Sequence, residues 1–90
     1  MTRVCYEPRL PALEFRGHAG AGVRGQDPVC AALSILLFTL VEGVEGAQLR
    51  AGEGRCRVSG GDRASYALIA GGCRLLAENY PDCVSMEVRT

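Results

Sequence analysis

The sequence predicts a two-layer α+β sandwich in which two helices cover one face of a mixed β-sheet, with the elements in the order ββαββαβ. Three observations lead to this fold class. Short segments alternate apolar and charged residues, two longer segments repeat apolar residues at helical spacing, and turn residues separate them. Elements in this order pack as layers around one core. The 90 residues suffice for one small domain, residues 1–90.

The first two strands are predicted to form an antiparallel hairpin. Arg3–Tyr6 is short and β-compatible, Pro8–Pro11 provides a turn, and Leu13–Arg16 alternates apolar and charged residues. A glycine-rich loop follows. Because glycine lacks the Cβ that restricts the backbone, we expect high backbone freedom around Gly20, Gly22 and Gly25.

The first helix is predicted to begin at Asp27-Pro28 and to end near Glu45. A carboxylate at the cap followed by Pro at the first helical position is a common helix start. Apolar residues at three- and four-residue steps form a stripe, and others widen it. The stripe and its extension are Val29, Leu33, Leu36, Leu37, Phe38, Leu40, Val41 and Val44. Such a helix is buried on more than one side, and a second copy of the chain could cover the outer side.

The second half of the chain repeats the strand, strand, helix order. A hairpin is predicted within Ala47–Gly60, with its turn at Gly52–Gly54, and Val84–Arg89 alternates as a closing strand. The order of the strands in the sheet does not follow from the sequence.

A second helix is predicted from the cap Asp62 to about Asn79, with Pro81 beyond its end. Two glycines in its middle, Gly71 and Gly72, should each cost about 1 kcal/mol relative to Ala unless close packing requires them. We expect its core face to consist of Leu68, Leu75, Leu76 and Tyr80.

Composition excludes several classes of protein. A hydrophobic content of 48% is too high for a disordered chain. Ten arginines balance ten acidic residues, and this zero net charge argues against direct nucleic-acid binding. The longest apolar run, 29–41, is too short to span a membrane, and the N-terminus lacks the apolar region of a secretory signal.

The cysteines predict a reducing compartment. Five cysteines form an odd set without a C-x-x-C pair, which favours reduced thiols and a cytoplasmic location. A single histidine among scattered thiols argues against a metal site, and we expect no cofactor.

Cys30 and His18 are the candidate catalytic residues. Cys30 is the third helical residue if Asp27 is the cap, and the unpaired N–H groups of a first turn stabilise a thiolate and could bind an oxyanion. His18, the only histidine, lies twelve positions earlier, and the loop between them is long enough to bring the imidazole to the sulfur. A thiol beside a general base is the minimum requirement for thiol acyl transfer.

Each of these residues also has a purely structural interpretation. A Cys in an apolar helix is often a small buried hydrophobe, and a His beside Gly is often a turn residue. Asp27 could be a cap alone or could also orient His18. Ser34, one turn after Cys30 on the same face, could bond to a helix carbonyl or contribute to the site.

Other reactive side chains are interpreted as structural. Four cysteines occupy strand or helix positions with no His nearby in sequence, and three arginines of the second hairpin form either a basic patch or a solvated sheet edge. These residues are Cys5, Cys56, Cys73, Cys83, Arg50, Arg55 and Arg57.

Two strings carry a family resemblance: Gly17-His18-Ala19-Gly20, and Gly25-Gln26-Asp27-Pro28-Val29-Cys30-Ala31-Ala32-Leu33-Ser34. Together they resemble the ribosomal-processing cysteine protease family (Prp, the YsxB-like proteins). The family pattern is G-H-A, a glycine-containing loop, and G-x-D-x-V-C-A-A-x-S at a helix start. The spacing from His18 to Cys30 matches the pattern without a gap.

The resemblance implies an endopeptidase that removes a short N-terminal extension from a large-subunit ribosomal protein precursor, and it implies a homodimer. It assigns Cys30 as nucleophile and His18 as base. Other matching positions would support the site or form a loop that orders over the substrate. The supporting residues are Gly17, Asp27 and Ser34, and the loop glycines are Gly20, Gly22 and Gly25.

Two other functions fit the same residues. The chain could be an inactive ribosome-assembly or interaction module that kept the fold. It could also be a redox sensor in which Cys30 is oxidised reversibly without peptidase activity.

Overall fold

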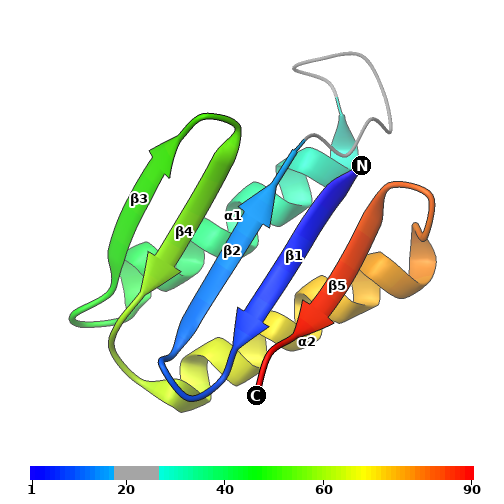
Figure 1. Cartoon of the computed structure of the whole chain (residues 1–90). Coiled ribbons are helices and arrows are strands. Elements are labelled where there is room, and N and C mark those ends of the chain that lie inside the picture. Colours follow the sequence, from blue (N-terminus) through cyan, green and yellow to red (C-terminus); the bar gives the residue numbers. More distant parts are fainter. Residues whose placement is uncertain (18–26) are drawn as a thin grey trace.

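The computed structural model describes residues 1–17 and 27–90. Within these ranges the elements follow the predicted order ββαββαβ (Figure 1). They are β1 (Thr2–Glu7), β2 (Ala12–Arg16), α1 (Pro28–Gly43), β3 (Gln48–Gly52), β4 (Arg55–Ser59), α2 (Arg63–Asn79) and β5 (Val84–Val88). Neither helix is long and apolar enough to cross a membrane.

The strands form one mixed sheet in the order β3-β4-β2-β1-β5. Both predicted hairpins are confirmed, because β1 pairs antiparallel with β2 and β3 pairs antiparallel with β4. The closing strand β5 lies parallel to β1, with Val84 opposite Thr2. The first and last strands are therefore neighbours, and the N-terminus lies beside the start of β5.

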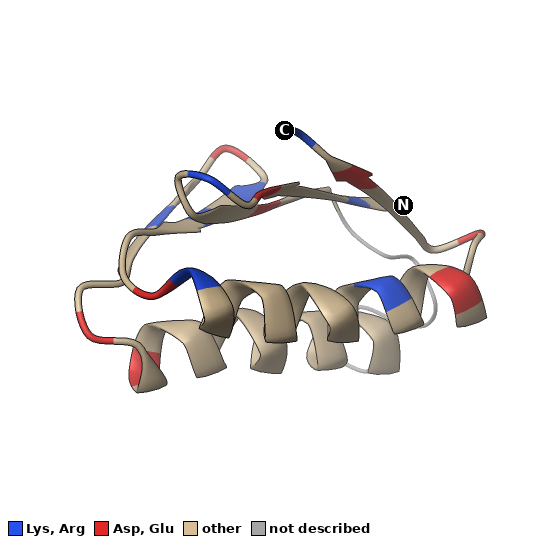
Figure 2. Cartoon of the chain, turned by 90° about the horizontal axis from the view of Figure 1, so that it is seen from below, with Lys and Arg blue, Asp and Glu red and all other residues tan. Residues whose placement is uncertain are grey.

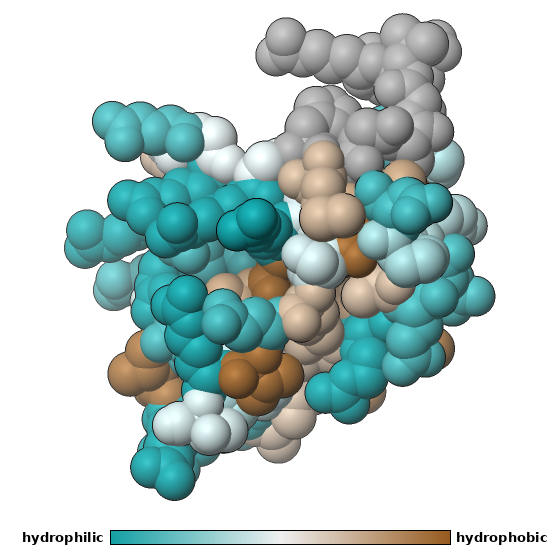
Figure 3. Space-filling model, turned by 45° about the vertical axis from the view of Figure 1, so that its right-hand side comes forward, coloured by the Kyte–Doolittle hydropathy of each residue, from teal (hydrophilic) through white to brown (hydrophobic). Residues whose placement is uncertain are grey.

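Both helices lie on the same face of the sheet, as predicted (Figures 1 and 2). The alternation of each strand sends one set of side chains toward the helices. These inward residues form the core and include Val4, Leu13, Phe15, Val58 and Val84. Charged residues such as Arg3, Glu14 and Arg16 occupy outward positions of the strands, and hydrophilic residues cover much of the surface in the view of Figure 3.

Helix α1 begins as the sequence predicts. Asp27 has an extended backbone conformation and caps the helix, and Pro28 is the first helical residue. Four residues of the predicted stripe are buried: Val29, Leu33, Leu37 and Leu40. The helix ends at Gly43, slightly before the predicted Glu45, and the backbone N–H of Val44 donates to the carbonyl of Leu40 at 3.0 Å.

Helix α2 has the predicted bounds but not the predicted core face. Leu68, Leu75 and Tyr80 are 78%, 61% and 47% exposed, so their assignment to the core was wrong. The buried residues are Tyr66, Ala70 and Cys73, which follow one another at steps of four and three. Leu76 is half-buried and packs against the core.

Helix α1 approaches α2 closely at Gly72. A Cβ on Gly72 would lie 2.9 Å from the Leu36 Cδ2 atom of α1, so little space remains between the helices. Tyr66, Ala70 and Cys73 pack inward, and the side of α2 that carries Leu68 and Leu75 remains outside. A single sequence contains both apolar sides of the helix and does not say which of them meets a neighbour.

Candidate active site

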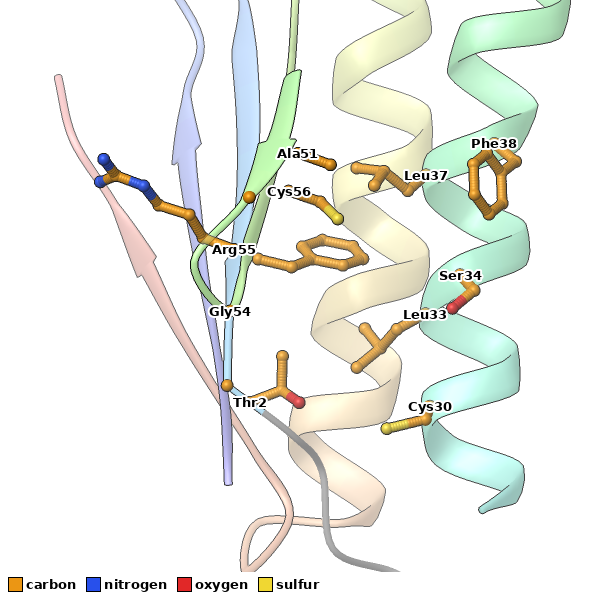
Figure 4. Close-up of a pocket in the computed structure, with 13 residues that line it drawn as sticks. Thr2, Cys30, Leu33, Ser34, Leu37, Phe38, Ala51, Gly54, Arg55 and Cys56 are labelled. Atoms are coloured by element: carbon orange, nitrogen blue, oxygen red, sulfur yellow. The ribbon is translucent and has the colours of Figure 1, made fainter. Parts of the chain in front are cut away.

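A cavity of about 360 Å³ lies between α1 and the sheet, beside the start of the helix (Figure 4). It contains Cys30, and its lining is mainly apolar. The lining residues are Thr2, Phe15, Gly17, Cys30, Leu33, Ser34, Leu37, Phe38, Ala51, Gly52, Gly54, Arg55 and Cys56. A site of this size and character suits an apolar group of a bound ligand.

Cys30 is the third residue of α1, as predicted, and it is half-buried. Its Sγ points into the cavity in Figure 4. Ser34 follows one turn later and lines the same cavity, so the predicted shared face of these two residues is confirmed. The helix thereby presents a thiol and a hydroxyl along one wall of the site.

Asp27 holds the first turn of α1 together. Its side chain is buried, and its Oδ1 accepts hydrogen bonds from the backbone N–H groups of Val29 at 2.9 Å and Cys30 at 3.1 Å. The Asp27 carbonyl accepts from the N–H of Ala31 at 3.1 Å. The predicted capping role is therefore confirmed.

The same bonds correct one expectation about catalysis. The N–H groups of Val29, Cys30 and Ala31 all donate to Asp27, and Pro28 has no N–H to donate. The first turn therefore keeps no unused donor with which to bind an oxyanion or to stabilise a thiolate. The sequence predicted these groups from helix geometry alone and did not account for how completely the cap uses them.

Gly17 brings the chain to the mouth of the cavity. Its φ is +84°, and a Cβ there would lie 2.6 Å from the Met1 carbonyl oxygen, so only glycine fits. Its N–H donates to the Gly54 carbonyl at 2.9 Å, which ties the end of β2 to the β3–β4 turn. His18 and the loop glycines Gly20, Gly22 and Gly25 lie outside the described residues.

Several cavity residues were not identified from the sequence. Thr2 and Phe15 lie on inward-facing positions of β1 and β2, and Ala51 and Cys56 lie on facing positions of β3 and β4. Strand alternation predicts that such residues face the helices, but it does not show which of them meet α1. Cys56 was expected to be structural, yet it lines the cavity. The Arg55 side chain points away from it (Figure 4).

Burial suppresses ionisation of two of the remaining thiols. All five cysteines lie in the described ranges, and none of them is joined in a disulfide. Burial raises the pKa of the Cys73 thiol to about 12, and burial also raises the pKa of Cys5. Over the described ranges, His, Cys, Asp and Glu side chains form no cluster of three suited to a metal ion.

The fold is similar to that of several solved structures, and two of them are of one protease. The essential ribosomal processing protease Prp from S. aureus, in complex with a covalently linked product peptide, matches with a TM-score of 0.82 and 17% identity, covering 99% of this chain and 100% of that chain. The same protease with a substrate peptide gives a TM-score of 0.73 and 16% identity, with the same coverage. SMU.848 from Streptococcus mutans gives 0.64 and 24%, covering 99% and 92%.

At these identities the structural matches show the fold. No sequence among the curated proteins matches this chain. The model of one protein family, described as cysteine protease Prp, matches residues 1–85, which is nearly the whole chain. The chain therefore belongs to the cysteine protease Prp family.

Proposed function

We propose that this chain is an endopeptidase that removes a short N-terminal extension from a large-subunit ribosomal protein precursor in the cytoplasm. Cys30 is the nucleophile and His18 is the general base. The observation that carries the proposal is the position of Cys30: a half-buried thiol on a capped helix start, opening into an apolar cavity. The S. aureus protein with the same fold is a ribosomal processing protease seen with peptides.

The reaction needs one proton to move twice. His18 takes the proton from the Cys30 Sγ as the sulfur attacks the carbonyl carbon of the scissile peptide bond. The same imidazole returns the proton to the leaving amine as the C–N bond breaks, which leaves a thioester on Cys30. Water, deprotonated by His18, then attacks the thioester, the C–S bond breaks to release the second product, and the imidazolium returns the proton to the Cys30 sulfur. Each group returns to its starting state.

Chain connectivity supports the role of His18. Gly17 lines the same cavity as Cys30, and consecutive Cα atoms lie about 3.8 Å apart. His18 is also the only histidine in the sequence, so the chain has no other imidazole that could act as the base. Because the first-turn N–H groups donate to Asp27, thiolate formation at Cys30 depends on this base more than the sequence alone suggested.

The apolar lining supports a peptide substrate with a large apolar side chain near the scissile bond. Leu33 and Leu37 from α1 and Phe15 from β2 are among the apolar residues that line the cavity. Burying such a side chain contributes about 1.5–3 kcal/mol, which favours binding of a segment that carries a large apolar side chain.

A homodimer is part of the proposal. The outer side of α1 carries Ile35 and Phe38, two large exposed apolar residues, and they line a shallow groove with Thr39, Glu42 and Gly43. Phe38 also lines the Cys30 cavity, so this surface is continuous with the site. Its burial against a second copy would cover the side of α1 that the sheet and α2 leave open.

The test is cleavage of the extended precursor, followed by intact mass measurement of the products. The wild-type chain should release the N-terminal extension as one peptide. Cys30→Ala and His18→Ala should release none, while Cys5→Ala, altered on the opposite face of the sheet, should cleave normally. Product formation by Cys30→Ala would contradict the proposal.

A further inference from the structure

A buried hydroxyl in the Cys30 cavity has no hydrogen-bond partner among the described residues. Thr2 is only 3% exposed and lines the cavity, and its Oγ1 is buried and unpaired. Buried polar groups are nearly always paired, because an unpaired one loses its bonds to water without replacement. Valine has the same shape and would suit this position opposite Val84 without that cost.

The hydroxyl and the thiol face each other. Figure 4 shows the Oγ1 of Thr2 and the Sγ of Cys30 pointing toward one another, the first from β1 and the second from α1. Both residues line the same cavity. A peptide carbonyl attacked by this sulfur would therefore share the cavity with an unpaired hydroxyl that points toward the sulfur.

The backbone donors nearest the sulfur are already in use. The N–H groups of Val29 and Cys30 donate to the Asp27 carboxylate, and the N–H of Ala31 donates to the Asp27 carbonyl. When sulfur adds to a carbonyl, the oxygen gains negative charge and needs a hydrogen-bond donor that is already in position. The donor must then come from an element other than the first turn of α1.

We propose that Thr2 is a catalytic residue whose hydroxyl donates a hydrogen bond to the carbonyl oxygen of the scissile peptide bond. This rests on the proposed peptidase function. As the S–C bond forms, the C=O electron pair moves onto oxygen, and the Thr2 O–H stabilises that charge without giving up its proton. The pair returns to the carbonyl when the C–N bond breaks. The apolar lining strengthens the hydrogen bond because it lowers the local dielectric constant.

Two substitutions distinguish the effect of the Thr2 hydroxyl from the effect of the side chain's branched shape. Thr2→Val removes the hydroxyl and keeps the branched side chain, and Thr2→Ser keeps the hydroxyl. The assay is cleavage of a synthetic peptide that spans the end of the precursor's extension, with kcat and KM measured separately and urea unfolding measured on the same proteins. Thr90→Val, the same exchange at the exposed C-terminus, is the matched control.

Thr2→Val should lower kcat by about a hundredfold, with KM nearly unchanged, because the bond forms only in the transition state. Its urea midpoint should stay the same or rise, since an unpaired buried group has been removed. Thr2→Ser should recover most of kcat, and Thr90→Val should match wild type. A rate in Thr2→Val close to wild type, a change in KM alone, or a lowered urea midpoint would overturn the proposal.

Failure of the proposed Thr2 role can be distinguished from failure of the proposed peptidase function. If wild type does not cleave the peptide at all, the peptidase assignment fails and the Thr2 role fails with it. If wild type cleaves and Cys30→Ala does not, the peptidase assignment stands. The kcat of Thr2→Val then decides the role of the hydroxyl alone.

Discussion

The Asp27 carboxylate accepts a hydrogen bond from the backbone N–H of Cys30 at 3.1 Å, so the cap of α1 and the proposed nucleophile are directly joined. The same oxygen accepts from Val29 at 2.9 Å. The position of the thiol in the cavity thus depends on Asp27, the residue that caps the helix. The Asp27 carboxylate is hydrogen-bonded to the backbone of the residue that carries the sulfur.

Substitution of Asp27 should separate capping from charge. Asp27→Ala should lower the free energy of unfolding by about 1–2 kcal/mol, because it removes a buried N-cap. Asp27→Asn retains an oxygen that accepts both bonds and should stay within about 0.5 kcal/mol of wild type. Urea unfolding measures both. We also expect Asp27→Ala to lose more kcat/KM than Asp27→Asn, and the reverse order would show that Asp27 does not act mainly as the cap.

The two adjacent glycines of α2 should respond differently to alanine. Gly71 has open space where a Cβ would lie, so Gly71→Ala should raise the free energy of unfolding by about 1 kcal/mol through helix propensity alone. Gly72→Ala should gain less, because its Cβ would lie 2.9 Å from Leu36 Cδ2 and that side chain must shift. Chemical denaturation of the pair is the measurement. Equal gains would show that α1 and α2 do not pack as closely as described.

Stability should fall at high pH because of Cys73. Burial raises the pKa of this thiol from 9.0 to about 12, so the unfolded chain loses the proton first as the pH rises above 9. Between about pH 9 and about pH 12 each pH unit should therefore remove up to about 1.4 kcal/mol from the free energy of unfolding. Cys73→Ala should show a shallower decline over this range. Parallel slopes in the two proteins would contradict the buried, protonated thiol.

Self-association should depend on the outer side of α1. Ile35 is 66% exposed within the proposed dimer surface, so Ile35→Glu should place two like charges against each other across the interface and give a monomer. Leu68→Glu is the control, because Leu68 is 78% exposed on the other helix. Sedimentation analysis distinguishes the species. A wild-type monomer, or a dimer that survives Ile35→Glu and not Leu68→Glu, would exclude this surface.

Local sequence patterns predicted most of the fold. Strand alternation, the caps Asp27 and Asp62, and the glycine turn before Arg55 act over a few residues, and each has its expected place. The pairing of β5 with β1 could not be predicted, because it joins residues at opposite ends of the chain. The prediction of the core face of α2 was wrong for a related reason: the buried residues Tyr66, Ala70 and Cys73 are selected by contacts with elements far away in the sequence.

The candidate site likewise contains some residues that the sequence predicted and others that only the folded structure identifies. The motif predicted Asp27, Cys30 and Ser34, which lie in the first turns of α1 or cap it, and Gly17, which follows β2 and lines the same cavity as Cys30. Thr2 has no sequence signal, because only the folded sheet brings the first strand opposite the Cys30 thiol. The use of the first-turn N–H groups by Asp27 is likewise visible only from the hydrogen bonds.

Selective alkylation of Cys30 tests the central claim most directly. The folded protein is treated with less than one equivalent of iodoacetamide, and the label is located by peptide mapping while cleavage of the precursor is followed. We predict that the label collects on Cys30, that activity falls in proportion to it, and that His18→Ala slows this labelling to the rate of the other half-buried thiols. Label spread evenly over Cys5, Cys56 and Cys83, or full cleavage activity after Cys30 is labelled, would contradict the account.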